Sequence, residues 1–197
     1  MVCVQGQSVE NSQVNIVCYT GGACGDLITA LIEVGDTQIA GSAVKINKDR
    51  LKLKKPYLFS SDQEKDAYLN LVRSKYKSIS SHDFEYHKKN NHKIIVIDVD
   101  DWDNALWAAR RFKNLHKDVI WKQIMSDCNI SSVTDYAKLM IDFSQMATNY
   151  ATCSIKLSDI TNGNLIEKLH TVYKLQLDSS AEQFYKKWLT EVIPTCG

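Results

Sequence analysis

The sequence lacks any long apolar run. Its longest apolar stretches span about five or six residues, well short of the roughly twenty that a membrane-spanning helix needs. The opening residues, 1–7, contain no basic group and no apolar core, so a secretion signal is not expected. These absences lead us to expect no membrane partner and a cytoplasmic location.

A charge excess of either sign is missing as well. The 24 Lys and Arg residues nearly balance the 23 Asp and Glu residues, for a formal net charge of +1, which gives no general argument for nucleic-acid or membrane binding. The local exception is the basic stretch Lys45–Lys55. Such a run is usually a solvated face, but it also suits a polyanion such as nucleic acid, and both interpretations stay open.

The six cysteines lack the CxxC pattern and the paired spacing of a zinc site. With 197 residues and a hydrophobic content of 44%, the chain can bury a core without disulfides, so we expect reduced thiols. His87 and His92 flank two lysines and two asparagines, with no cysteine or carboxylate at ligand spacing. We therefore expect a solvated turn there and no metal site.

Short β-branched segments alternate with helical ones along the chain. The clearest strands are Val14–Tyr19 and Lys93–Val99, and the second is a continuous apolar run typical of a strand buried on both faces. The alternation predicts βαβ crossovers and a three-layer α/β/α fold with a mostly parallel sheet and a helix-rich C-terminal half. The length favours one domain over residues 14–197, after a flexible arm at residues 1–13.

Helical periodicity and capping signals place the remaining elements. Ser61, with Glu64 three residues later, predicts a capped helix start. Trp102 and Phe112 lie on one face of the helix that follows the second strand, and the tryptophan spacing in this region favours core packing. Helices are expected over residues 27–33, 61–76, 102–115, 119–127, 133–149, 165–173 and 181–191, with further strand candidates at 37–44, 79–83 and 154–160.

The first strand runs directly into a glycine-rich turn that is followed at once by a helix. The turn consists of Thr20, Gly21, Gly22, Ala23, Cys24 and Gly25. Glycines let the backbone point its N–H groups inward, and the helix N-terminus adds a partial positive charge, so this turn is a natural place for a phosphate group.

Asp26 stands where a nucleotide-binding loop would carry its lysine. That loop usually ends with a lysine for the phosphates and a hydroxyl residue for magnesium, whereas this chain continues with Asp26 and Leu27. Asp26 either caps the helix with its side chain or faces a ligand as a base or a metal contact. The sequence leaves both alternatives open.

Two polar pairs complete the candidate site. His82 and Asp83 lie at the C-terminal end of the strand candidate 79–83, at the edge where parallel sheets place ligands. They are candidates for a base or a metal ligand, although neighbouring residues on a strand point to opposite faces, and a polar loop is the simpler interpretation. Arg110 and Arg111 lie in a helix beside Trp107, where they either clamp a phosphate or make a salt bridge and pack on an aromatic ring.

The order of these elements resembles the P-loop kinase and sulfotransferase-like superfamily, above all its small viral and phage members. The resemblance covers residues 14–175 and is carried by the strand, glycine turn and helix, by His82-Asp83, by the strand Ile94–Val99 with its arginine-bearing helix, and by Ser154–Ile160 with the helix after it. It implies a phosphotransferase that uses ATP with Mg²⁺ and acts on a nucleoside, a nucleotide or a related hydroxyl acceptor, in the host cytoplasm if the chain is viral.

The chain departs from that pattern in two places. The first loop has no lysine, and the second strand ends in Asp98-Val99-Asp100-Asp101 instead of leading to the arginine and serine that hold the donor nucleotide of true sulfotransferases. A catalytically inactive interaction or virion-associated module with this fold is therefore the alternative to a phosphotransferase. A sulfotransferase ranks third.

Overall fold

The computed structural model describes residues 15–36, 61–73, 78–116, 118–173 and 179–193. Within these ranges, no helix combines the length and the apolar character that a membrane crossing requires. The elements in chain order are β1 (Asn15–Cys18), α1 (Gly25–Asp36), α3 (Asp62–Arg73), β2 (Ser78–Ser81), α4 (Phe84–Lys89), β3 (Ile94–Asp98), α5 (Trp102–Leu115), α6 (Asp118–Asp127), α7 (Val133–Thr148), β4 (Cys153–Lys156), α8 (Leu157–Thr161), α9 (Leu165–Tyr173) and α10 (Ser179–Val192).

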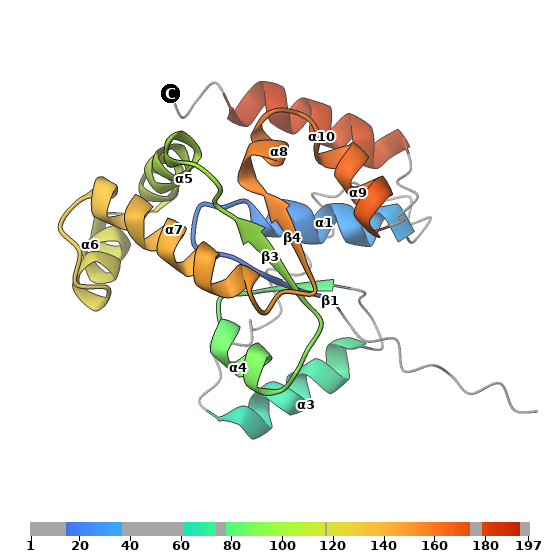
Figure 1. The fold of residues 1–197 in the computed structure, drawn as a ribbon, viewed down its shortest axis with the longest axis horizontal. Helices are drawn as coiled ribbons and strands as arrows, with labels where there is room; N and C mark the ends of the chain where they lie inside the picture. The colour runs from blue at the N-terminus through green and yellow to red at the C-terminus, as the bar shows by residue number, and fades with distance from the viewer. Residues whose placement is uncertain (1–14, 37–60, 74–77, 117, 174–178, 194–197) are drawn as a thin grey trace, which may run out of the picture.

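The described strands form one parallel sheet in the order β2-β1-β3-β4 (Figure 1). In register, Val17 of β1 lies between Ser80 of β2 and Ile95 of β3, and Ile97 of β3 pairs with Ile155 of β4. The chain moves outward from β1 to β2 and then returns to build β3 and β4 on the other side of β1. This reversal of strand order marks the carboxyl edge around β1 as the place where such sheets bind ligands.

Both faces of the sheet are buried. Along β3, Ile94 and Val96 pack into one apolar cluster, while Ile95 and Ile97 pack into another, because successive side chains of a strand point to opposite faces. Helices α3 and α4, with the C-terminal part of α7, contribute to the first cluster, and α1 and α5 to α10 contribute to the second. Figure 1 shows α3 and α4 on one side of the sheet and α1, α9 and α10 on the other. The fold is therefore α/β with an all-parallel sheet, an arrangement compatible with the expected three-layer α/β/α fold.

Helix α5 begins and ends at the expected residues, and local signals explain why. The side chain of Asp101 accepts a hydrogen bond of 2.8 Å from the backbone N–H of Asn104, which caps the start of the helix. The start of α3 is capped as predicted, with the N–H of Glu64 3.3 Å from the Ser61 hydroxyl. The expected helices at 119–127, 133–149, 165–173 and 181–191 correspond to α6, α7, α9 and α10 within two residues at each end.

The structure corrects three expectations. Helix α1 continues past Gly35 to Asp36. The segment from His87 to His92, which we expected to be a solvated turn, begins with the last three residues of α4, a helix capped by Asp83 that the sequence pattern did not reveal. The strand candidate at 154–160 is divided into β4 and the short helix α8, whose Leu157 and Ile160 share one buried face. The strand candidate at 37–44 and the basic stretch Lys45–Lys55 lie outside the described residues.

Candidate functional site

The glycine turn is a compact connection with two residues in the left-handed region of the backbone. The φ angle is +93° at Gly22 and +62° at Cys24. The N–H of Ala23 donates to the carbonyl of Thr20 at 3.1 Å, which closes the turn, and the carbonyl of Cys24 accepts from the N–H of Leu27 at 3.0 Å. Glycine adopts a positive φ without steric cost, whereas a cysteine there is uncommon.

Asp26 lies inside the first turn of α1, one residue after the helix begins at Gly25. Its place is therefore not that of a residue preceding the helix, which is where an N-cap stands. A carboxylate in a first turn is still favoured by the positive end of the helix dipole. Asp26 also lines the cavity described below, so the side chain is near any ligand that the turn holds.

The glycines are required by packing. A Cβ atom at any of three positions would overlap atoms that cannot easily move. These contacts are Gly21 with the ring of Phe112, Gly22 with the carbonyl oxygen of Ala108, and Gly25 with the ring of Tyr19. The glycine pattern is thus explained by the fold itself, and a ligand is not needed to account for it.

Two side chains from other helices hold the turn by its carbonyl groups. The guanidinium of Arg111 on α5 donates to the carbonyl of Gly22 at 3.1 Å, and the hydroxyl of Tyr136 on α7 donates to that of Gly21 at 3.3 Å. Burial raises the pKa of Tyr136 well above its ordinary value, so the phenol remains a proton donor. The Tyr136 ring stacks on Phe112 with 5.3 Å between centroids.

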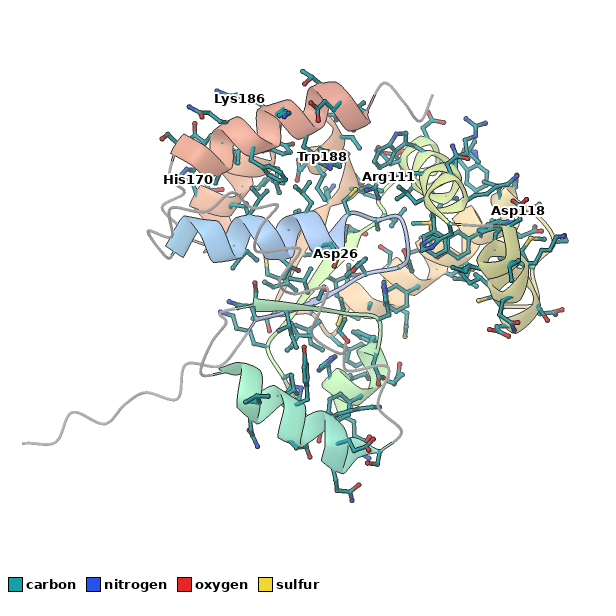
Figure 2. The ribbon with its side chains drawn as sticks, turned by 180° about the vertical axis from the view of Figure 1, so that it is seen from behind. Asp26, Arg111, Asp118, His170, Lys186 and Trp188 are labelled. Atoms are coloured by element: carbon teal, nitrogen blue, oxygen red, sulfur yellow. The ribbon has the colours of Figure 1, made fainter. Side chains whose placement is uncertain are left out.

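A cavity of about 620 Å³ opens beside the turn, a volume typical of small-molecule sites. Four residues of the turn line it, and Figure 2 shows Asp26, Arg111 and Trp188 gathered between α1, α5 and α10. Its polar side chains are those of Asp26, His82, Arg111 and His116. Its apolar side chains include those of Phe112, Leu115, Ile120, Ile124, Phe184 and Trp188.

His82 is oriented by the end of β1. Its Nδ1 atom lies 2.7 Å from the carbonyl oxygen of Tyr19, and the two rings are 4.4 Å apart. A carbonyl only accepts hydrogen bonds, so Nδ1 carries the proton and Nε2 is the basic nitrogen of the neutral ring. Since His82 lines the cavity, it is suited to take a proton from a bound molecule.

Asp83 serves a different purpose from its neighbour. It caps α4 by accepting from the N–H of Tyr86 at 3.3 Å, and it pairs with the ammonium of Lys65 at 2.6 Å. This hydrogen bond raises the pKa of Lys65. Asp83 does not line the cavity, so the structure places His82 at the candidate site and Asp83 outside it.

Of the two arginines and the turn residues that were candidates from the sequence, some line the cavity and others do not. Arg111 lines the cavity, whereas Arg110 is exposed on α5 and does not. In the turn, the lining residues are Gly21, Gly22, Cys24 and Gly25. Ala23 is fully buried in the core, and the Thr20 hydroxyl is buried with no hydrogen-bond partner among the described residues.

The carboxylates at the end of β3 all have partners in neighbouring elements. Asp98 accepts from the hydroxyl of Ser144 at 2.5 Å, and Asp100 accepts from that of Ser158 at 2.5 Å. Asp101 caps α5. None of the three lines the cavity, so these carboxylates tie β3 to α5, α7 and α8 and are separate from the candidate site.

Two expectations about aromatic residues are wrong. His87 is fully buried, with Nε2 2.9 Å from the Ser81 hydroxyl and Nδ1 3.0 Å from Nδ1 of His92, because α4 packs it against the end of β2. Burial lowers the pKa of His87 to about 3. Trp102, the first residue of α5, is 41% exposed, whereas Trp121 is in the core as expected.

Sequence reasoning missed the far wall of the cavity. His116 packs edge-on against Phe112 at 4.4 Å, and Ile120, Phe184 and Trp188 reach the cavity from α6 and α10. The sequence predicted a helix over residues 181–191, but nothing local indicates that the turn more than 150 residues earlier lies opposite it.

The charged groups of the described lining fit one phosphate group. Arg111 is the only permanently cationic side chain among the described lining residues, and Asp26 is the only carboxylate. One guanidinium matches one phosphate or sulfate, whereas the triphosphate of ATP carries more charge than it offsets. Within the described ranges, no three His, Cys, Asp or Glu side chains are grouped to hold a metal.

In comparisons with protein-family models, curated proteins and solved structures, nothing matches this chain. Its function must therefore be inferred from the cavity and its lining.

Proposed function

We propose that this chain is a transferase that holds a phosphate-type group at the glycine turn and passes it to a hydroxyl acceptor. The observation that carries the proposal is the cavity itself. Arg111, His82 and Asp26 come from three different parts of the fold and line the same space of about 620 Å³. A cation, an oriented base and a carboxylate at the carboxyl edge of a parallel sheet are the groups that phosphoryl transfer uses.

Arg111 is the group that would bind the phosphate. A guanidinium has five N–H donors in a planar fork, so its single bond to the Gly22 carbonyl leaves donors for an anion. That bond also holds the side chain in position before a ligand arrives. The N-terminus of α1, which faces the same cavity, adds favourable backbone dipoles.

His82 would act as the base. The donor in this proposal is ATP with Mg²⁺, whose metal ion would offset the triphosphate charge that Arg111 alone does not. As the hydroxyl oxygen of the acceptor attacks the γ-phosphorus, Nε2 of His82 takes the hydroxyl proton. The bond from phosphorus to the bridging oxygen breaks with its electron pair, and ADP leaves. Asp26 offers a carboxylate oxygen, which is the ligand type that Mg²⁺ takes together with phosphate oxygens. The resemblance to P-loop kinases supports the same assignment of reaction type.

A binding module without catalysis is the second candidate. It is favoured by the packing of Gly21, Gly22 and Gly25, which accounts for the glycine pattern without a nucleotide, and by the missing lysine. A sulfotransferase ranks third, because the carboxylates after β3 occupy the place of the donor-binding arginine and serine.

Ligand-induced stabilisation tests the phosphate site. Wild-type protein is heated with inorganic phosphate, with sulfate and with ATP and Mg²⁺, alongside Arg111→Gln and its matched control Arg110→Gln. A ligand that binds only the folded state must raise the melting temperature. We expect a rise in wild type and in Arg110→Gln and none in Arg111→Gln. No rise with any of the three ligands at millimolar concentration would contradict the proposal.

Transfer itself is tested with His82→Gln. Radiolabelled phosphate is followed from ATP to a panel of hydroxyl compounds. We expect the variant to keep its ligand-induced stabilisation and to lose most of the transfer, since general-base catalysis contributes about 10²–10⁴-fold. Binding without transfer in the wild type would leave the binding module as the function.

A further inference from the structure

We infer that the acceptor is an apolar hydroxyl compound, whose phosphomonoester product lies with its phosphate at Arg111 and its apolar body against α5, α6 and α10. The inference rests on the proposed function for the position of the phosphate. It adds the chemical class of the acceptor, which it takes from the opposite wall of the cavity.

The two ends of the cavity differ in chemistry. The turn, Asp26, His82 and Arg111 make one end polar. The other end is formed by Leu115 from the last turn of α5, by Ile120 and Ile124 from α6, and by Phe184 and Trp188 from α10. A sugar would place hydroxyl groups against these side chains, whose aliphatic and aromatic carbons offer them no hydrogen-bond partner.

The apolar end is partly exposed to solvent. Leu115 is 62% exposed and Ile120 is 45% exposed, although both line the cavity. Trp121, the neighbour of Ile120 on α6, is only 6% exposed and packs into the core. An apolar body placed over Leu115 and Ile120 would remove their surface from water, which favours binding.

The size of the cavity favours a small molecule with a substantial body. A phosphate group alone would leave most of the 620 Å³ unfilled, and pockets of this size usually enclose most of the surface of a drug-sized ligand. The single guanidinium of the described lining matches one phosphate group at one end of that ligand. An alkyl or aryl phosphomonoester meets both conditions.

The inference is tested by measuring the binding of three phosphomonoesters and of inorganic phosphate. Phenyl phosphate and hexyl phosphate carry apolar bodies, ribose 5-phosphate carries a polar one, and inorganic phosphate carries none. Isothermal titration should give affinities about tenfold or more tighter for phenyl or hexyl phosphate than for the other two, a difference of about 1.4 kcal/mol. Equal affinities for all four would overturn the inference and leave the phosphate site intact.

A pair of neighbouring variants locates the apolar body. Ile120 lines the cavity, whereas Val119 is 77% exposed and does not, so Ile120→Asn introduces an asparagine into the lining and Val119→Asn introduces one outside it. We expect Ile120→Asn to abolish the preference for the apolar esters and Val119→Asn to keep it. A preference that survives Ile120→Asn, or that both variants lose, overturns the placement.

The failures of the two proposals are distinguishable. If ATP with Mg²⁺ stabilises the protein but neither apolar ester binds better than ribose 5-phosphate, the acceptor class is wrong and the transferase proposal stands. If none of these phosphate compounds binds, the phosphate site itself is wrong. Thermal unfolding of both α6 variants without ligand controls for loss of the fold.

Discussion

The guanidinium of Arg111 donates a hydrogen bond of 3.1 Å to the carbonyl oxygen of Gly22, which lies 89 residues away in the sequence. Through this bond, α5 fixes both the conformation of the glycine turn and the position of the cation at the wall of the cavity. A cation that is already held loses less conformational freedom when an anion binds. The stability of the turn and its affinity for phosphate are therefore coupled at Arg111.

That coupling predicts the effect of Arg111→Lys. Lysine keeps the positive charge but loses the planar fork that bonds the carbonyl and an anion together. We expect the free energy of unfolding to fall by about 1 kcal/mol, the usual contribution of one hydrogen bond, and phosphate binding to weaken. Urea unfolding and phosphate titration measure the two effects. Arg110→Lys is the control, and a surface change there should stay within about 0.5 kcal/mol.

The two glycines with positive φ among the described residues predict unequal costs of substitution. Gly22 (φ +93°) faces the Ala108 carbonyl oxygen at a distance that no Cβ tolerates, whereas Gly163 (φ +87°) meets only the end of Leu189 at 3.7 Å. Both alanine variants incur the cost of a left-handed residue, about 1–2 kcal/mol. Gly22→Ala adds a clash with the α5 backbone, so its loss of stability in urea unfolding should be clearly larger. Equal losses would show that the turn can move away from α5.

The fold was predictable from the sequence wherever a local signal determines the structure. Helix α5 was predicted at its bounds because its apolar residues recur at helical spacing, and the Asp101 cap found in the structure explains why it starts there. The continuous run around Ile95 predicted a strand buried on both faces, and β3 is that strand. Helix α4 was missed because its six residues are too few to show a period, and only the Asp83 cap marks it.

The candidate site was predictable only in part, because some of its residues are brought to the cavity by tertiary packing and not by a local sequence signal. The glycine turn and His82 come directly after strands, and Arg111 lies in the helix that follows a third. Their residue types and their places in the chain therefore made them candidates for the site. Whether Arg110 or Arg111 faces the cavity depends on the rotation of α5 about its axis, and Arg111 is the one that does. Trp188 reaches the cavity through packing of α10 against the rest of the fold, which leaves no pattern in the local sequence.

Tyr136 allows the support of the turn to be tested without removing an aromatic ring. Tyr136→Phe removes the hydroxyl that bonds the Gly21 carbonyl at 3.3 Å and keeps the stacking on Phe112. We expect the free energy of unfolding to fall by about 1 kcal/mol and phosphate binding to weaken, because the turn loses one of its two anchors. Unfolding in urea and phosphate titration measure both. A stable variant with reduced affinity would show that the hydroxyl matters for the ligand alone.

His87 predicts how stability depends on pH. Burial holds its pKa at about 3 in the folded protein, against an ordinary value of 6.5, and its Nε2 and Nδ1 atoms are bonded to Ser81 and His92. Between these two pKa values the unfolded chain binds a proton that the folded chain does not. The contribution of the neutral, buried His87 to the free energy of unfolding is therefore fully present above about pH 6.5, and it is lost progressively as the pH falls toward 3. At about pH 4.5 the loss should be on the order of 2–3 kcal/mol.

The variant His87→Gln isolates that contribution, because glutamine has no proton to bind in this range. Urea unfolding at about pH 7 and pH 4.5 should show a smaller difference for His87→Gln than for wild type, with the reduction on the order of 2 kcal/mol. His170→Gln, in α9 and away from this cluster, should keep the wild-type difference. If His87→Gln also keeps it, the acid sensitivity comes from other groups, and His87 accepts a proton in the folded state without loss of its partners.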